Sequence, residues 1–199
     1  MQPDKNTELS RKGLILKHFP LVTAGFVTCV ALLVIFAWQL RSDWLVTNVP
    51  RLFYMQHMTA TLFLLSSASL LLNIYHYKKY ALASGSIVVV MALAILLQYT
   101  LGVDFGLDQL LIDDYIHPES EYPGRPAPNT AVSFLATGIA LLLLCHERAQ
   151  TGKYRLVIEL IGFIIFALGA HAIGGVSGVC SRCLCLGHRY THVCPYRRV

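Results

Sequence analysis

The sequence predicts an all-α protein, a polytopic membrane helix bundle of about five transmembrane helices. Of the 199 residues, 55% are hydrophobic and only 14% are charged, which leaves too little polar side chain to cover a soluble domain. Five stretches are long and apolar enough to cross a hydrocarbon core of about 30 Å. They are residues 20–40, 54–75, 82–102, 129–146 and 156–174.

The first span is expected to be an uncleaved anchor. It follows the basic residues Arg11, Lys12 and Lys17 and ends near Arg41. It is too long for a signal peptide and lacks a small-residue cleavage site. Lysine and arginine mark the cytoplasmic side of a membrane, so we expect the N-terminus, residues 1–19, to be cytoplasmic.

The connectors predict one consistent topology. Basic residues place two connectors inside, and the segment 41–53 and the acidic loop 103–128 then lie outside. The net charge of +5 is therefore explained by basic residues that mark the cytoplasmic side of the membrane, and we expect no nucleic-acid partner. Tryptophans near the end of the first span and tyrosines at an inner turn suit the headgroup zones. The residues are Lys78, Lys79, Arg148, Lys153 and Arg155 for the basic connectors, and Trp38, Trp44, Tyr75, Tyr77 and Tyr80 for the aromatics.

One segment is repeated. The sequence TATLFLLSSASLLL (59–72) aligns without gaps with TAVSFLATGIALLL (130–143), and KKY (78–80) and GKY (152–154) each introduce the next span. The predicted unit is a helical hairpin of about 70 residues, used at least twice. Small and hydroxyl residues on these helices allow close contact in lipid.

The entry to the second copy is sharply defined. Asn129 is expected to be the N-cap, and three preceding prolines prevent the helix from extending back into the loop. Convergent leucine-rich spans are the competing interpretation of the repeat, but they do not explain the shared Thr-Ala entry and phenylalanine.

GVDFGLDQLL (102–111) and YPGRPAPNTAVSFLATGIALLLL (122–144) resemble the N-terminal multi-pass membrane region of bacterial PAS, histidine-kinase or diguanylate-cyclase signalling proteins. The resemblance covers about residues 14–170. It implies a sensory and anchoring region of a signal-transduction or two-component protein in the bacterial inner membrane. It also implies a homodimer formed through transmembrane helices, with no enzymatic activity in this chain and with the effector modules missing from it.

The outer loop holds the candidate ligand-sensing residues. Carboxylates close in sequence could share a cation, but no twelve-residue calcium loop is present, and solvated loop charge is the competing interpretation. Residues 106–116 could form a short interfacial helix. We expect no catalytic residue, metal ligand or cofactor. The candidates are Asp104, Asp108, Gln109, Asp113, Asp114, Arg125 and Asn129.

Two other functions stay open as alternatives. A haem-binding membrane protein could use the pairs His57 with His171 and His76 with His146, and a transporter subunit would need helices broken at the midplane. A zinc site in the tail is a further alternative, because its cysteines and histidines exceed four soft ligands. The tail ligands are Cys180, Cys183, Cys185, His188, His192 and Cys194.

The tail, residues 175–199, departs from the rest of the chain. The family pattern and the repeat both stop near Ala170. Arginines follow an odd number of spans, so they fall outside, against the rule that the other connectors obey. A frameshift near residue 170 explains these departures, since another frame of the tail permits a third Thr-Ala helix entry. We therefore expect a truncated sensor region: residues 1–19, a membrane region 20–174 and an atypical basic tail, 175–199, for which a shifted reading frame and a native tail are the two competing interpretations.

Overall fold

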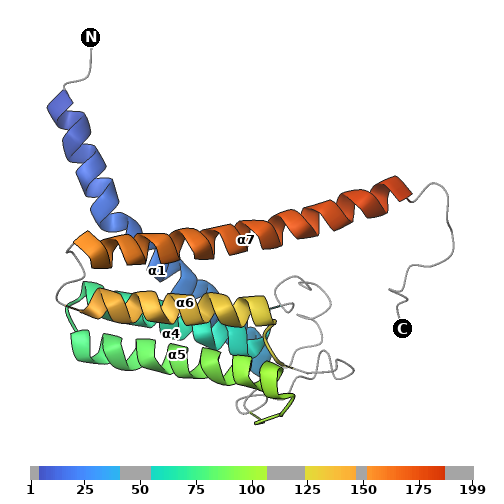
Figure 1. The fold of residues 1–199 in the computed structure, drawn as a ribbon. Coiled ribbons are helices and arrows are strands. Elements are labelled where there is room, and N and C mark those ends of the chain that lie inside the picture. Colours follow the sequence, from blue (N-terminus) through green and yellow to red (C-terminus); the bar gives the residue numbers. More distant parts are fainter. Residues whose placement is uncertain (1–4, 41–54, 107–123, 147–151, 187–199) are drawn as a thin grey trace.

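The computed structural model describes residues 5–40, 55–106, 124–146 and 152–186, with side chains from residue 18 to residue 170 within those ranges. The described residues form five helices and no strand (Figure 1). The predicted all-α class is therefore confirmed. The helices are α1 (Lys5–Gln39), α4 (His57–Ile74), α5 (Lys78–Leu101), α6 (Pro128–Cys145) and α7 (Gly152–Leu186).

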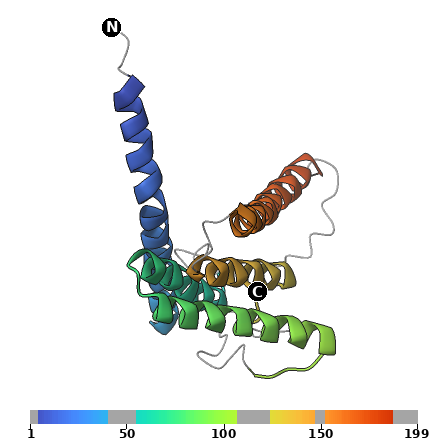
Figure 2. The same ribbon diagram turned by 60° about the vertical axis from the view of Figure 1, so that its left-hand side comes forward.

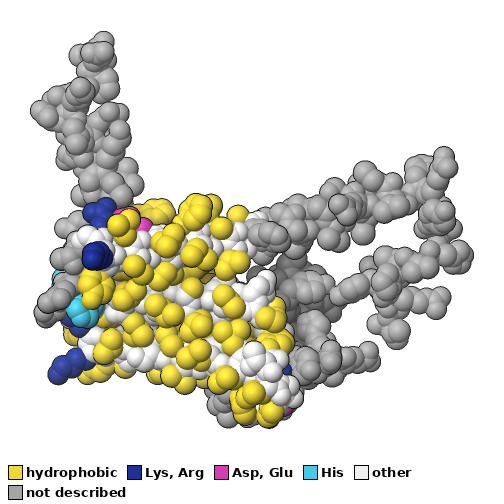
Figure 3. All heavy atoms as spheres, in the orientation of Figure 1, with side chains coloured by type: hydrophobic (Ala, Val, Ile, Leu, Met, Phe, Trp, Pro, Cys, Tyr) yellow, Lys and Arg dark blue, Asp and Glu magenta, His cyan; other side chains and the backbone are white. Residues whose placement is uncertain are grey.

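Four helical segments are long and apolar enough to cross a membrane: His18–Gln39 within α1, and the whole of α4, α5 and α6. Large apolar side chains point outward from them, including Phe26 at 69% exposure and Val90 at 63%. The described surface in Figure 3 is correspondingly rich in hydrophobic side chains. An outward apolar surface is costly in water and favourable in lipid, so the four helices indicate a membrane protein.

The helix bounds differ from the predicted ones. α1 begins at Lys5 and runs through Pro20, where the sequence suggested a start near residue 20. α5 begins at Lys78 rather than near residue 82, because lysine and tyrosine are compatible with a helix even where they are too polar to count toward a span. The fifth predicted span, 156–174, lies within α7, which continues to Leu186; the side chains of 171–174 lie outside the described residues.

The helices pack in a simple order. α1 packs on α4, α4 on α5, α5 on α6, and α6 on α7, while α4 and α6 also touch each other. Figure 2 shows α1 and α7 on opposite sides of the α4 and α6 pair, with α5 on the remaining side. Each of α4 and α6 thus lies between the helix that precedes it and the helix that follows it.

Small residues allow this close packing, as the sequence predicted. A Cβ built on Gly138 of α6 would lie 2.6 Å from Val89 Cγ2 of α5, so only glycine fits there. Between α4 and α5, Ser69 Oγ donates to the carbonyl oxygen of Ala81 at 2.8 Å and Ser84 Oγ donates to that of Leu65 at 2.9 Å. In lipid, where no water competes, such bonds and close contacts hold helices together.

The ring of Trp38, which the sequence predicts near a headgroup zone, is buried against a neighbouring helix. Its side chain is only 1% exposed and packs with Val34 and Ala60 between α1 and α4. The indole nitrogen donates to the carbonyl oxygen of Met55 at 3.1 Å. This bond satisfies its polar group, so the ring can be buried. Trp44 lies outside the described residues.

The prediction that Asn129 is the N-cap of α6 is wrong. The helix begins at Pro128 with Ala127 as its N-cap, and no side chain caps it. Asn129 lies in the first turn, where its Oδ1 accepts a hydrogen bond from the Thr130 backbone N at 2.9 Å. Proline is favoured at the first helical position because the N–H that it lacks would have no helical partner.

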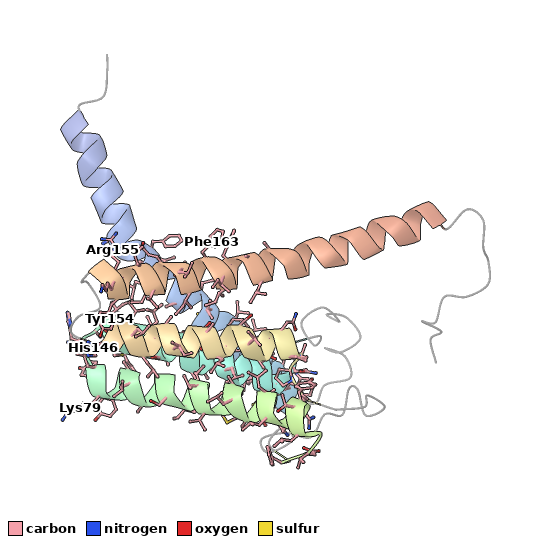
Figure 4. All side chains as sticks on the ribbon, in the orientation of Figure 1. Lys79, His146, Tyr154, Arg155 and Phe163 are labelled. Atoms are coloured by element: carbon pink, nitrogen blue, oxygen red, sulfur yellow. The ribbon has the colours of Figure 1, made fainter. Side chains whose placement is uncertain are left out.

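The bundle has two chemically different ends. The basic end holds Lys79, His146, Tyr154 and Arg155 (Figure 4), and Tyr75, Tyr77 and Tyr80 are exposed there. Arg155 Nε donates a hydrogen bond to Glu159 at 2.8 Å, which raises the pKa of Arg155. The opposite loop end is formed by residues 103–106 and 124–127.

Candidate functional site at the loop end

Arg125 is the centre of the loop end. Its side chain is only 2% exposed, and its Nη2 lies 3.2 Å from Asp104 Oδ1, in a carboxylate that is 71% exposed. A buried guanidinium is tolerated when its charge is paired and its N–H groups find acceptors. Arg125 follows Gly124 just before α6, and Asp104 follows the end of α5. The ion pair therefore ties the end of α5 to the start of α6.

A single oxygen of Asp104 accepts hydrogen bonds from three groups. Besides Arg125, Gln98 Nε2 donates to Oδ1 at 3.2 Å and the backbone N of Gly106 donates to it at 2.9 Å. Gln98 is fully buried on α5. Charge-assisted hydrogen bonds of this kind are stronger than those between neutral groups, so Asp104 fixes the path of the chain as it leaves α5.

Tyr99 completes the link from the α5 side. The guanidinium carbon of Arg125 lies 5.4 Å from the centroid of the Tyr99 ring, which is a cation–π distance. The Tyr99 hydroxyl donates to the carbonyl oxygen of Pro126 at 3.1 Å. One α5 side chain thus holds both residue 125 and residue 126, so that the segment entering α6 is attached to α5 at two points.

Glycines make the turn possible. Gly102, which ends α5, has φ 63°, and Gly106 has φ 67°. Both values lie in the left-handed region, where a side chain is disfavoured. The turn at Gly102 brings Asp104 back beneath α5, and the conformation of Gly106 directs its N–H toward that carboxylate.

The seven candidate residues of the outer loop fall in different places. Two of the seven candidate residues, Asp104 and Arg125, meet as an ion pair. Asn129 instead lines a cavity between α6 and α7. Asp108, Gln109, Asp113 and Asp114 lie outside the described residues, as does the expected interfacial helix beyond residue 106.

Two residues of the cluster were missed, Gln98 and Tyr99 of α5. The available signal was an amide and a phenol side by side, near the end of an otherwise apolar span. A buried amide in such a place needs polar partners, and the acidic loop that follows could have supplied one.

The histidines of the haem alternative differ in burial and in position. His57 is buried on α4, with its ring edge-on to Trp38 at 6.3 Å between centroids. His76 and His146 are exposed at the basic end, and His146 stacks on Tyr154 at 5.5 Å. The side chain of His171 lies outside the described residues, as do the tail cysteines and histidines. Within the described part of the chain, no three His, Cys, Asp or Glu residues are grouped to hold a metal ion.

Comparison of the chain with known protein families, with curated proteins and with solved structures gives no match. In the residues that it describes, the structure is all-helical, has four helices suited to a membrane, and joins its loop-end segments through a buried arginine.

Proposed function

We propose that this chain is the membrane-embedded sensory and anchoring region of a bacterial signal-transduction protein whose effector module lies outside these 199 residues. We place the N-terminus and the basic end in the cytoplasm and the loop end outside the inner membrane. The observation that carries the proposal is the loop-end cluster. A buried Arg125, paired with an exposed Asp104, joins two transmembrane helices at the base of an acidic loop.

The cluster supplies a mechanism for sensing. The Asp104 carboxylate is exposed to the outside and holds Arg125 and Gln98. A ligand or a change in the bilayer that moves the loop would change these bonds and so change how α5 and α6 are joined. A stimulus shifts the population of two packings only if it interacts differently with each. Asp104 is exposed in an otherwise buried cluster, so a stimulus can interact with it in one packing and not in the other.

The helix packing explains how a displacement at the loop end would reach the basic end. α5 and α6 are in close contact where Gly138 meets Val89, so a displacement of one moves the other. Of the other helices, α7 packs chiefly on α6. A tilt of α6 would therefore move α7, which starts at the basic end, where the family resemblance places the link to effector modules. Small helix shifts of this kind are a common form of transmembrane switching.

The repeated hairpin and a homodimer belong to the same proposal. In support of the repeat, Phe63 of α4 and Phe134 of α6, which occupy equivalent positions, meet edge to face at 4.8 Å between ring centroids. Two copies of the chain would associate through an outward apolar face such as that of α1, where Phe26 is exposed. The effector modules of each copy would then lie close together in the cytoplasm.

A chimera tests the proposal. Residues 1–170 would replace the matching five-helix stretch of an intact histidine kinase of the resembling family, so that the next helix of that kinase returns its catalytic module to the cytoplasm, and autophosphorylation would be measured in membrane vesicles. We expect Arg125→Met or replacement of residues 103–128 by a Gly/Ser loop to change the kinase output several-fold, because the bond between loop and α5 is lost. The matched control is Val90→Leu on the outward face of α5. An output unaffected by either loop-end change would contradict the sensory role.

A further inference from the structure

Two cavities lie next to each other along the contact between α4 and α6. Their volumes are about 240 and 210 Å³, and both are lined by Phe63 and Thr137. The first is bounded by α7 and the second by α1, and Figure 2 shows these two helices on opposite sides of the α4 and α6 pair. Because they share lining residues, the two cavities form one elongated groove.

The groove has the length of a single lipid chain. On α6 it extends from Asn129, at the loop end, to Leu141, which is about 18 Å at 1.5 Å per residue. One leaflet accounts for about 15 Å of the hydrocarbon core of a membrane. An apolar cavity of about 150 Å³ already holds a benzene molecule. Two larger cavities in a row therefore suit a chain that reaches from the membrane surface to the middle of the bilayer.

The mouth of the groove, at the loop end, is polar. Asn129 Oδ1 accepts a hydrogen bond from the Thr130 backbone N, but the Asn129 amide nitrogen and the Thr130 hydroxyl form no hydrogen bond among the described residues. Ser133 Oγ donates to the carbonyl oxygen of Asn129 at 2.9 Å, and its lone pairs can still accept. The mouth thus offers both donors and acceptors to a ligand.

The deeper part of the groove is apolar, although several of its residues carry hydroxyl groups. The hydroxyls of Thr23 and Thr137 donate to backbone carbonyl oxygens of their own helices, at 2.9 and 2.8 Å. Ser67 Oγ does the same and also accepts a hydrogen bond from Thr28, and Ser66 Oγ is itself enclosed. The groove therefore has a polar end and an apolar end, as an amphiphile has.

The charges of the groove select the head group. No charged side chain lines either cavity, and Arg125 at the loop end is already paired with Asp104. A phosphate or carboxylate at the mouth would have no cation in the lining to bind it, and a charge that leaves water without a partner is strongly disfavoured. A head group that is polar but uncharged fits the mouth better.

We propose that the groove binds a single-chain lipid with an uncharged, hydrogen-bonding head group, such as a monoacylglycerol. The head group lies at the mouth, where Asn129 and Thr130 bind its oxygen atoms. The acyl chain runs past Phe63 toward Leu141. The inference concerns binding alone and stands independently of the sensory role.

Photolabelling of the full chain in nanodiscs tests the proposal. The probe is monopalmitoylglycerol with a photoreactive diazirine in the middle of its acyl chain, and mass spectrometry of the fragments locates the adducts. We expect adducts around Phe63 of α4 and Thr137 of α6 to exceed severalfold those around Leu93, which is exposed on α5. Unlabelled monopalmitoylglycerol should compete about tenfold better than palmitoyl lysophosphatidylglycerol, which has the same chain and an anionic head.

Two threonine variants test the position of the head group. Thr130→Val removes a hydroxyl at the mouth, whereas Thr100→Val removes an exposed hydroxyl at the loop end of α5 that lines neither cavity. We expect Thr130→Val to weaken labelling about fivefold, the factor that one hydrogen bond provides, and Thr100→Val to leave it unchanged.

Two glycine variants of α7 test the position of the chain. Gly169 lines the groove and Gly162 does not, and neither has an atom within 4 Å of a built Cβ. Gly169→Leu should fill the groove and remove the adducts on α4 and α6, whereas Gly162→Leu should keep them. Equal melting temperatures of the two variants show that the loss is not caused by unfolding.

Four results would overturn the proposal. Adducts as frequent on α5 as on α4 and α6 would show ordinary contact with bulk lipid, or a groove closed by a second copy of the chain. Equal competition by the anionic lipid would exclude selection of an uncharged head. Equal labelling of Thr130→Val and Thr100→Val would remove the head group from the mouth, and adducts that survive Gly169→Leu would place the chain outside the groove.

Discussion

At the scale of single residues, Arg125 and Asp104 define the chemistry of the loop end. The guanidinium is buried and the carboxylate is exposed, so the two partners contribute unequally. Removing the carboxylate leaves a buried cation short of an acceptor, whereas removing the arginine leaves a carboxylate that water can solvate. Gln98 and Tyr99 add a hydrogen bond and a cation–π contact from α5.

The first prediction is a coupling between these two residues. Asp104→Ala should destabilise the protein by about 2 kcal/mol and Arg125→Met by only about 1 kcal/mol, and the double variant should lose less than the sum of the two. We expect a coupling of about 1 kcal/mol, since the exposure of Asp104 screens the pair. Unfolding in mixed micelles at increasing SDS measures these values. Strictly additive losses would show that the ion pair makes no net contribution.

The sequence could identify Asp104 and Arg125 but not their neighbours. Both are charged residues in an otherwise turn-forming loop, and opposite charges at the two ends of a loop are natural partners. Gln98 and Tyr99 were hidden because they sit in a span whose average hydropathy is high. The packing of Trp38 was also beyond the sequence, because its position shows its depth but not whether it faces lipid or another helix.

At the scale of the helices, glycine and serine decide how closely the spans approach. Gly138 lies against Val89 of α5, and Ser69 and Ser84 bond α4 to α5 in both directions. These contacts were predicted from the small and hydroxyl residues of the repeat. The residues that these glycine and serine residues contact were not predicted, because the periodicity of a sequence identifies a helix face but not the residue on the neighbouring helix that meets it.

The second prediction concerns Gly138. Gly138→Ala should destabilise the protein by about 1–3 kcal/mol, because the new methyl group overlaps Val89 Cγ2. Gly162→Ala is the matched control, since its Cβ meets nothing within 4 Å, and it should be neutral or slightly stabilising. Val89→Ala should restore part of the loss. Thermal melting in detergent measures all three, and equal stability of the two glycine variants would exclude a tight α5 and α6 contact.

The third prediction concerns the serines between α4 and α5. Ser69→Ala and Ser84→Ala should each cost about 0.6 kcal/mol, the typical value of an interhelical hydrogen bond in a membrane. Ser86→Ala on α5 is the control, because neither of the two hydrogen bonds described between α4 and α5 involves Ser86. Unfolding in SDS again measures the loss in stability. If Ser69→Ala and Ser84→Ala lose no more stability than Ser86→Ala, these hydrogen bonds are energetically neutral.

Helix ends illustrate the limit of local sequence signals. The prolines correctly predicted where α6 begins, but Asn129 was assigned a role that Pro128 makes unnecessary. α1 and α7 extend beyond their apolar cores. Hydropathy measures what lipid accepts, whereas the backbone continues as a helix through polar residues until a proline, a glycine or a turn ends it.

At the scale of the whole molecule, composition alone determined the fold class. Helices are the natural solution for a chain this apolar, because each span satisfies its own backbone hydrogen bonds. The order of packing, the groove beside α4 and α6, and the link at the loop end depend on contacts between distant segments, and the sequence offered only the repeat as a guide to them.

The fourth prediction is the orientation in the membrane. With the native cysteines replaced by serine, Phe105→Cys at the loop end should react with a membrane-impermeant maleimide on spheroplasts. Lys79→Cys at the basic end should react only after the membrane is opened, because the basic residues hold that end in the cytoplasm. The reverse pattern would place the acidic loop in the cytoplasm and exclude external sensing.

The most direct test of the sensory account is a distance measurement across the basic end. Spin labels at positions 79 of α5 and 153 of α7, in nanodiscs, would be compared between the native cluster and Arg125→Met by pulsed electron resonance. Thr28→Ala, which removes a hydrogen bond between α1 and α4, is the control for a lost contact between unlabelled helices. If the loop end governs helix packing, Arg125→Met shifts the distance distribution and Thr28→Ala does not. Identical distributions for all three proteins would contradict transmission from the loop end to the basic end.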